Sequence, residues 1–227
     1  MPEYYLPAPS VVLRVLVERF GQIAPHLGVT LTEAILGFVV GNLAAIGFAL
    51  AFSEIRVVRE SLYPLVVGLQ AVPVVAVAPF VTVWFGPGLA GKAFLAGLIC
   101  YFPAVVVATD SFARVDRESF MFLRSLGATR WEIFRHLRLP SAVPGVFSAL
   151  RISITLCTVG AVVAELSGAG RGVGYLIVRA SYEFNTPLLF AVLLATSSAT
   201  FLLFRFVERI GDRYSARFGF THTNAQA

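Results

Sequence analysis

The chain has 227 residues, of which 57% are hydrophobic and only 14% are charged, and its mean hydropathy is +0.80. A soluble domain usually carries about 25% charged residues, so this composition excludes an ordinary soluble globular protein and favours one whose apolar surface faces lipid. The formal net charge is +5. Because the basic residues lie mostly between the apolar segments, as orientation in a membrane requires, the charge does not call for nucleic acid, and we predict no nucleic-acid partner.

The N-terminal segment, residues 1–30, is mixed in composition and is expected at the outer membrane surface. Within it, Val11 to Phe20 has apolar residues at helical spacing and charged residues on the other face. This pattern is typical of a helix that lies in the membrane interface. The first residues lack the basic and then apolar pattern of a signal peptide.

The first predicted membrane-spanning helix runs from Leu31 to Phe52, with Thr30 or Thr32 as its cap. Small residues recur every four positions along it, which would let a second helix pack closely against it; chance placement in an apolar helix is the alternative. These small residues are Gly37, Gly41, Ala45 and Ala49.

A charged loop is predicted at 53–60, and the uncharged segment after it is too long for one span. Because Gly86-Pro87-Gly88 is a turn signal, we place one span at about 62–85 and the next at about 91–109. Three prolines should kink the first of these against a cavity or neighbouring protein, although the kinks could also serve packing alone. They are Pro64, Pro73 and Pro79.

Two further spans are predicted at about 145–166 and at 184–204, joined by a glycine-rich connection at 167–183. The sequence therefore predicts an all-α polytopic membrane protein with about five spanning helices, a membrane domain over residues 31–210 and a C-terminal tail over 211–227. Buried cysteine is usually a small apolar residue, and the two cysteines of the chain lie inside apolar segments, so no disulfide is expected.

The arginine-rich loop at 111–144 sets the predicted orientation. If this loop is cytoplasmic, thirteen of the 18 Lys and Arg residues lie on its side of the membrane, in agreement with the positive-inside rule. This orientation places the N-terminus outside and the tail inside.

Two short helices are predicted inside this loop. The first stops at Gly127, and Thr129 with Glu132 has the spacing of a capping box that would begin the second, whose apolar face carries Trp131 and Phe134. Two helices around a glycine hinge would form a rigid element that transmits motion from a soluble partner to the membrane helices. A helix that lies flat on anionic lipid is the alternative.

The end of the second short helix is predicted at Leu139-Pro140, and the following span is expected to open at Pro144. The loop thus contains LGA at 126–128, LRLP at 137–140 and PG at 144–145. These motifs and their spacing resemble the EAA loop of the inner-membrane permeases of bacterial ABC importers. The loop departs from the family at its start, where MFL at 121–123 stands in place of Glu-Ala-Ala.

The rest of the chain resembles the nitrate, sulfonate and taurine branch of this family, which also includes importers of pyrimidine thiamine precursors and of riboflavin. Members usually have six spans, with one before the LPAPS-like segment, so we expect that this helix is absent or that the start codon was assigned late. The motifs that carry the resemblance are LPAPS at 6–10, LGF at 36–38, VPVVAVAP at 72–79, WFG at 84–86, YFP at 101–103, VAE at 163–165 and GVGY at 172–175.

The resemblance implies a type I importer in the bacterial inner membrane, with a cytoplasmic coupling-helix loop. Its partners would be two ABC ATPase subunits, a second permease copy, an extracytoplasmic substrate-binding protein and membrane lipid; we expect the two permease copies to form a homodimer, and a heterodimer is the alternative. ATP and Mg would bind the ATPase, so this chain would be no enzyme and would hold no cofactor. The residues expected to contact the ATPase are Glu118, Leu126, Gly127, Ala128, Arg130, Trp131, Phe134, Leu139 and Pro140. An ATP-independent channel or secondary transporter is the alternative.

Polar residues inside the spans are the default candidates for a translocation pathway. A hydroxyl bonded to its own helix, or a solvated glutamate at the membrane surface, is the alternative. The candidates are Asn42, Gln70, Thr82, Thr155, Thr158 and Glu165. No basic residue lies in the middle of a span, which favours a neutral or aromatic solute. The chain has no GxxxxGK[ST] loop and no histidines at metal-ligand spacing, so we predict neither nucleotide binding nor a metal site.

Overall fold

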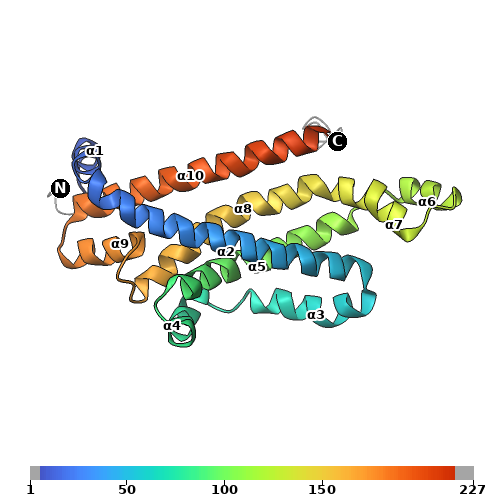
Figure 1. The fold of residues 1–227 in the computed structure, drawn as a ribbon, viewed down its shortest axis with the longest axis horizontal. Helices are drawn as coiled ribbons and strands as arrows, with labels where there is room; N and C mark the ends of the chain where they lie inside the picture. Colours follow the sequence, from blue (N-terminus) through green and yellow to red (C-terminus); the bar gives the residue numbers. More distant parts are fainter. Residues whose placement is uncertain (1–5, 218–227) are drawn as a thin grey trace. The chain divides into compact units, whose positions relative to one another are not determined.

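A computed structural model describes residues 6–217, and every regular element in that range is a helix (Figure 1). The elements in chain order are α1 (Pro9–Glu18), α2 (Phe20–Glu54), α3 (Arg56–Leu69), α4 (Val74–Phe85), α5 (Leu89–Ala113), α6 (Arg117–Ser125), α7 (Arg130–Ile133), the π-helical turn η1 (Phe134–Arg138), α8 (Leu139–Leu166), α9 (Val173–Tyr182) and α10 (Thr186–Arg217).

Four helices in the described part of the chain are long and apolar enough to cross a bilayer, which needs about 20 apolar residues. They are α2 with 35 residues, α5 with 25, the continuous helix Arg130–Leu166 with 37, and α10 with 31 over Thr186–Ala216. The pair α3 and α4 is together apolar enough to count as one more span. Within residues 6–217 this confirms an all-α polytopic membrane protein with about five spanning helices.

Helix α2 begins at Phe20, not at Leu31 as predicted. Thr30 and Thr32 therefore lie inside the helix rather than at its cap, and the Thr32 hydroxyl donates to the carbonyl of Gly28 at 2.8 Å. The prediction was wrong because the mixed composition before Leu31 concealed a helix. Pro25 lies inside that helix, where it removes one backbone hydrogen bond near the start.

The predicted kinked span at 62–85 is a broken pair of helices. Helix α3 ends at Leu69 and α4 begins at Val74, with Pro73 as the residue before its first turn. A proline disfavours the helical conformation of the residue before it, so Pro73 ends one helix instead of kinking it. The predicted loop at 53–60 is also wrong, because Ile55 alone separates α2 from α3.

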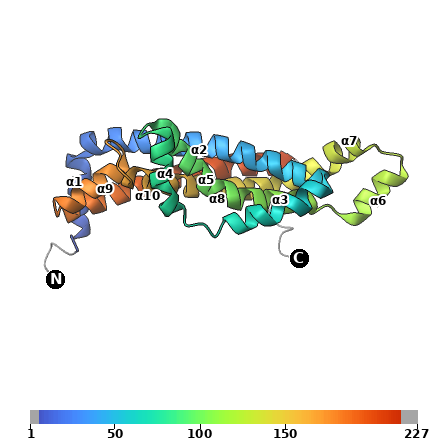
Figure 2. The ribbon, with the colours of Figure 1, turned by 90° about the horizontal axis from the view of Figure 1, so that it is seen from below.

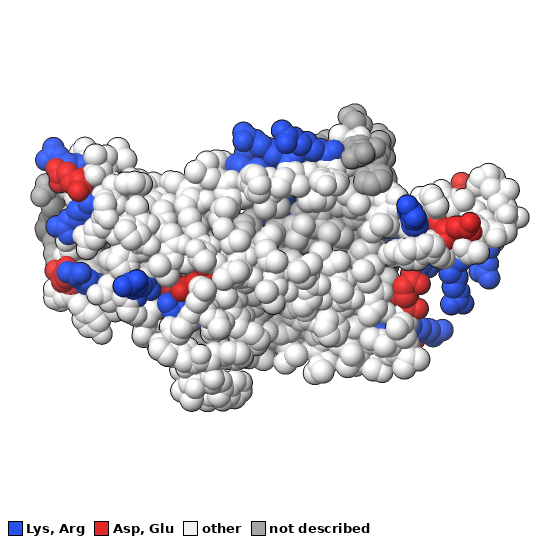
Figure 3. Space-filling view, in the orientation of Figure 1, with Lys and Arg blue, Asp and Glu red and all other residues white. Residues whose placement is uncertain are grey.

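The predicted connection at 167–183 contains a helix, α9, and α10 continues past the predicted end at Phe204. Its last part is amphipathic, because Val207 is buried while basic residues on the other face are exposed. Figure 3 shows these basic residues gathered over the C-terminal part of α10; they include Arg205, Arg209 and Arg213. Residues 1–5 of the predicted N-terminal segment and 218–227 of the predicted tail lie outside the described residues.

The chain divides into two compact units that share the long helices. Among the described residues, unit 1 contains 6–41, Pro73–Cys100 and Ile154–Phe204. In its core, the start of α2 packs with α1, α9 and α10 around buried Ile23 and Leu176.

Unit 2 contains, within the described part of the chain, Asn42–Val72, Tyr101–Ser153 and 205–217. Its core is built from the second half of α2 and the second half of α5, with Phe52 and Phe112 buried together. In Figures 1 and 2, α6 and α7 project beyond the end of α5 within this unit.

The small-residue stripe of α2 makes the predicted close helix contact. In unit 1, a Cβ atom on Gly37 would lie 2.6 Å from the Ala93 carbonyl oxygen, and one on Gly41 would lie 2.6 Å from the Gly97 carbonyl oxygen. Such distances leave no room for a side chain, so α2 and α5 touch backbone to backbone here. In unit 2, Ala45 and Ala49 continue the stripe into the buried core.

We expect Gly37→Ala to lower the melting temperature of the detergent-solubilised protein, because the added methyl group overlaps the backbone of α5. Overpacking of this kind costs about 1–3 kcal/mol. The measurement is a thermal unfolding curve. The matched control is Gly47→Ala on the same helix, where a Cβ meets no atom within 4 Å and alanine should stabilise the helix by about 0.5–1 kcal/mol. Equal melting temperatures for the two variants would contradict the close contact.

Candidate functional site

Helix α6 begins at a strong cap. The carboxylate of Asp116 accepts hydrogen bonds from the Ser119 hydroxyl at 2.5 Å and the Ser119 backbone N–H at 2.8 Å. These bonds stabilise the charged form and lower the pKa of Asp116 below its ordinary value. The helix ends before Gly127, as predicted, and Gly127 has a φ of 78°, a conformation that a β-branched residue rarely adopts.

Helix α7 begins with the predicted capping box. The Thr129 hydroxyl accepts from the Glu132 N–H, and the Glu132 carboxylate accepts from the Thr129 N–H at 2.7 Å. Trp131 stacks on Phe134 with ring centroids 5.6 Å apart. Ile133 is buried while Trp131 remains 65% exposed, so the helix is fixed on one side and presents an aromatic ring on the other.

No break separates α7 from α8, although one was predicted at Leu139-Pro140. The chain passes from α7 through the π-helical turn η1 directly into α8, and the Leu139 N–H bonds the Phe134 carbonyl oxygen. Pro140 has no N–H to donate and would clash in a regular α-helix. The wider π turn just before it provides room, so the helix continues and Pro144 lies inside α8.

Exposed apolar side chains gather on α6 and α7 and on the turn between them. Their exposed fractions are 59% for Met121, 63% for Phe122, 67% for Leu126 and 65% for Trp131. Scattered apolar residues are normal on a protein surface, but a group of large ones on projecting helices is typical of an interaction site. We call these four residues the α6–α7 apolar surface.

Basic side chains line a cavity on the other side of these helices in unit 2. The cavity measures about 450 Å³, and its lining includes Arg124, Arg130, Arg138 and Glu54. Arg138 donates to the Glu54 carboxylate at 2.5 Å and lies over the ring of Phe120. Of the predicted coupling residues, Leu126 and Trp131 lie on the α6–α7 apolar surface, and Ala128 and Arg130 line the basic cavity.

A second polar cluster, in unit 1, holds the beginning of α9. The N–H groups at a helix start have no partner within the helix, and here side chains of α2 and α8 accept them. The Gly172 N–H donates to His26 Nδ1 at 3.0 Å, and the Val173 N–H donates to the Thr30 hydroxyl at 2.8 Å. Thr30 in turn donates to the Glu165 carboxylate at 2.6 Å.

Glu165 completes this cluster from the end of α8. Its second oxygen accepts from the Gly174 N–H at 2.6 Å, and its side chain is 1% exposed. A carboxylate at a helix N-terminus is favoured by the helix dipole. Gly172 has a φ of 113°, and a Cβ there would overlap the carboxyl group of Glu165, so the turn fits closely around it. The solvated position that was the alternative for Glu165 is not found, and a role in the pathway stays a prediction.

Beside this cluster, Lys92 of α5 forms a buried ion pair with Glu33 of α2. The distance from Nζ to Oε1 is 2.9 Å, and the side chains are 11% and 1% exposed. The other carboxylate oxygen of Glu33 is buried and finds no hydrogen-bond partner among the described residues. A buried charge without a partner is costly, so the Glu33 carboxylate depends on Lys92.

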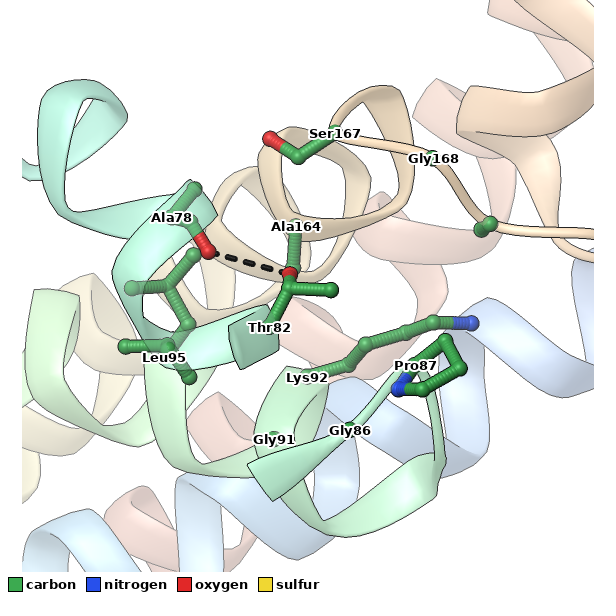
Figure 4. A pocket seen from close by; sticks show the side chains of 12 residues that line it. Ala78, Thr82, Gly86, Pro87, Gly91, Lys92, Leu95, Ala164, Ser167 and Gly168 are labelled. Carbon is green, nitrogen blue, oxygen red and sulfur yellow. Dashed lines mark hydrogen bonds between the residues drawn. The ribbon is translucent and has the colours of Figure 1, made fainter. Parts of the chain in front are cut away.

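The predicted pathway residues do not form one site. Thr82 lines a cavity of only about 10 Å³ with Lys92 and Ala164, room for about one water, and Figure 4 shows its hydroxyl bonded back to Ala78. Asn42 is buried and Gln70 is exposed at the break after α3, both in unit 2.

Thr155 and Thr158 do come together, in a groove between α8 and α10 of unit 1 that measures about 440 Å³. Sequence reasoning missed the α10 side of this groove, which adds Thr196, Ser197 and Thr200. Their signal was a run of hydroxyl residues in the last span. It also missed the Glu33–Lys92 pair and the α9 cluster, whose members are far apart in the sequence.

The comparisons identify relatives over most of the chain. Residues 37–216 match the family model described as "Binding-protein-dependent transport system inner membrane component". The riboflavin transport system permease protein of Chloroflexus aurantiacus is 33% identical, covering 95% of this chain and 82% of that protein. The formylaminopyrimidine transport permease protein of Halalkalibacterium halodurans is 30% identical, covering 91% and 83%. The taurine transport system permease protein of Escherichia coli is 29% identical, covering 88% and 75%.

The fold is similar to that of a solved transporter. An inward-facing structure of the MetNI methionine ABC transporter matches with a TM-score of 0.63 at 19% identity, covering 91% of this chain and 97% of that chain. At this level of identity the likeness concerns the fold.

We expect Lys92→Met to destabilise the protein by about 3–5 kcal/mol, because it leaves the buried Glu33 carboxylate uncompensated. The double variant Glu33→Gln with Lys92→Met should recover most of this loss, since both charges are then gone. Thermal unfolding in detergent compares the three proteins.

The control for this prediction is Arg56→Met, which breaks an ion pair whose side chains are 88% and 62% exposed. A surface pair of this kind contributes about 0–1 kcal/mol. A Lys92→Met protein that melts like the control, or a double variant no better than the single one, would contradict the assigned pair.

Proposed function

Because the chain belongs to the family of binding-protein-dependent transport system inner membrane components, and is the permease component of an ABC importer in the bacterial inner membrane, we propose that α6 and α7 couple it to ATP hydrolysis in a partner subunit. In this proposal the spanning helices form the pathway of a small organic solute or anion. ATP and Mg bind the partner ATPase.

The proposed assembly contains two of these permease chains, two ATPase subunits and an extracytoplasmic substrate-binding protein. The family description, which names dependence on a binding protein, supports the last of these. In the predicted orientation, the α6–α7 apolar surface faces the cytoplasm, where an ATPase would lie.

The α6–α7 apolar surface is the observation on which the coupling proposal rests. Its helices are fixed by the Asp116 cap and the Thr129 capping box, so they can bear force without unfolding. We expect Trp131 to contribute most to the binding of the ATPase, since large aromatic side chains dominate binding energy at protein interfaces.

A mechanical connection from this surface to the membrane is supported by the continuous helix Arg130–Leu166. Because no loop follows α7, a displacement of Trp131 must move α8 as well. Nucleotide changes the state of a transporter only through contacts that differ between its states, and in this proposal those contacts are made at Trp131.

For the solute, we propose a small organic molecule of the kind carried by this branch of the family. Relatives of similar identity are named for riboflavin, formylaminopyrimidine and taurine. The predicted lack of a basic residue within the spans is wrong, because Arg151 lies inside α8, so the proposal includes all three solute classes.

We expect Trp131→Ala to weaken ATPase binding by about tenfold or more, in the range of an interface hot spot. Solute-stimulated ATP hydrolysis should fall with it. Co-purification of the ATPase and ATP hydrolysis in proteoliposomes are the measurements. The matched control is Trp84→Ala, which removes another exposed tryptophan, 75% exposed, from α4 of unit 1.

A second pair of variants tests the hinge. Gly127→Val should abolish coupling, because a β-branched residue cannot hold a φ of 78° without strain, while Gly127→Asn should retain much of it, since asparagine tolerates this conformation. Full coupling in both Trp131→Ala and Gly127→Val, or solute flux without ATP, would refute the proposed function.

A further inference from the structure

The basic cavity of unit 2 carries more positive charge than its own residues compensate. Its lining contains three arginines and one carboxylate, so two positive charges remain in excess. The arginines are Arg124 of α6, Arg130 of α7 and Arg138 of η1, and the carboxylate is that of Glu54 at the end of α2. Basic side chains also gather beside α6 and α7 in Figure 3. A cavity lined by an excess of one charge attracts ligands of the opposite charge.

The one carboxylate in the lining is already paired. Arg138 donates to Glu54 at 2.5 Å, and their side chains are 27% and 43% exposed. The Arg138 guanidinium also lies 6.0 Å from the centre of the Phe120 ring, whose face attracts a cation. These two contacts hold Arg138 at the wall of the cavity and leave the other two arginines without a carboxylate.

Arg124 and Arg130 are exposed and reach the cavity from before and after the turn at Gly127. Within residues 6–217, neither side chain has a hydrogen-bond or ion-pair partner. The caps at Asp116 and Thr129 stabilise both helices, so the two arginines extend from regular helices rather than from a flexible loop. Each guanidinium presents N–H donors in a planar fork that matches two oxygens of one phosphate.

The charge and the size of the cavity fit a phosphate monoester. Such a group carries about −1.5 to −2 charges at pH 7, which the two excess positive charges would balance. Arginine binds phosphate through two parallel N–H···O bonds, which are roughly twice as strong as bonds between neutral groups. The cavity volume of about 450 Å³ lies within the usual range of small-molecule sites, roughly 300–1,000 Å³, so an organic group attached to the phosphate has room as well.

We propose that the basic cavity is a binding site for a phosphate monoester, which bridges Arg124 of α6 and Arg130 of α7. Bound there, the phosphate links the two helices across the turn at Gly127 and holds them beside the end of α2. The ligand is a soluble phosphate ester or the headgroup of an anionic lipid, because basic pockets at the cytoplasmic ends of membrane helices bind such headgroups and the predicted orientation places this cavity there. The site is separate from the α6–α7 apolar surface, so it does not depend on ATPase binding at that surface.

The rest of the lining indicates how the ligand lies. The Ser53 hydroxyl donates to the Leu50 carbonyl at 2.8 Å, so its hydrogen is not free for an anion. Phe120 and Ile133 are apolar, and Ile133 is buried. The phosphate therefore lies with the arginines, and an attached organic group contacts these two apolar side chains.

The first experiment measures thermal unfolding of the full chain in a neutral detergent, with inorganic phosphate or glycerol 3-phosphate compared with sodium chloride at equal ionic strength. A probe at about ten times its Kd should raise the melting temperature by about 3–6 °C, because it binds the folded chain alone. Arg124→Gln should weaken binding about tenfold or more, as expected for lost bonds to a charged group. The matched control is Arg117→Gln, which removes the same charge from an exposed residue of α6 outside the cavity lining.

The second experiment distinguishes the two sources of the phosphate. The same chains are placed in nanodiscs of phosphatidylcholine with and without phosphatidic acid, whose headgroup is a phosphate monoester, and their melting temperatures are measured. Stabilisation by phosphatidic acid that Arg124→Gln loses and Arg117→Gln keeps would assign the site to a lipid headgroup. Stabilisation by the soluble probes alone, with the same dependence on Arg124, would assign it to a soluble ester. Either result supports the site.

Other results would overturn it. One is that no probe stabilises the unchanged chain, and another is equal stabilisation of Arg124→Gln and Arg117→Gln, which would mean that only net charge matters. Loss of ATPase co-purification in Arg124→Gln, with no stabilisation of the unchanged chain by phosphate, would assign the cavity to a carboxylate of the ATPase instead. If Arg124→Gln fails to fold, Arg124→Lys replaces it, since lysine keeps the charge but loses the two parallel bonds; it should bind the probes more weakly than Arg117→Lys, and equal binding would also overturn the site.

Discussion

The need to pair buried backbone groups is the constraint on which this structure depends. Every N–H and C=O group that is shielded from water must find its partner inside the protein, and helix ends are where partners are missing. The start of α9 is buried and meets the constraint with three side chains from two other helices, His26, Thr30 and Glu165. The same bonds hold α9 to α2 and α8, so the pairing of one helix start also fixes the packing of unit 1.

The effect of a proline on the helix that contains it depends on the position of the proline in that helix. Pro25 near the start of α2 is tolerated, Pro73 separates α3 from α4, and Pro140 is bypassed by a π-helical turn. The residue type is the same in each case. What differs is whether the carbonyl that loses its partner lies at a helix start, at a break, or in a turn wide enough to avoid the clash.

Short sequence patterns correctly predicted the structural features that depend on neighbouring residues. The capping box at Thr129 and the glycine hinge at Gly127 depend on neighbours a few residues away, and both are found in the structure. The close contact at Gly37 was predictable because small residues at one helix face permit only that kind of packing.

Contacts between distant segments could not be predicted in the same way. Thr30 is a residue type that is typical of a helix cap, yet it lies within α2 and its hydroxyl donates a hydrogen bond to the Glu165 carboxylate. Lys92 and Glu33 are each a lone charge beside an apolar segment, and only the packing of α5 against α2 makes them a pair. The predicted end of the second short helix was wrong because Leu139-Pro140 favours a break. A π turn allows the helix to continue, and no short sequence pattern predicts such a turn.

The continuity of this helix matters most at its start. Trp131 lies in the first turn of the helix Arg130–Leu166, and Pro140 follows it within unit 2. A helix is stiff along its axis because each turn is bonded to the next, so Trp131 and the first part of α8 form one element, which a loop at Leu139-Pro140 would have divided. Pro140 also limits where the π turn can lie, since the residues after it resume regular α-helical bonding. The same residue that leads the sequence to predict a break therefore lies inside the element that carries the α6–α7 apolar surface into the membrane domain.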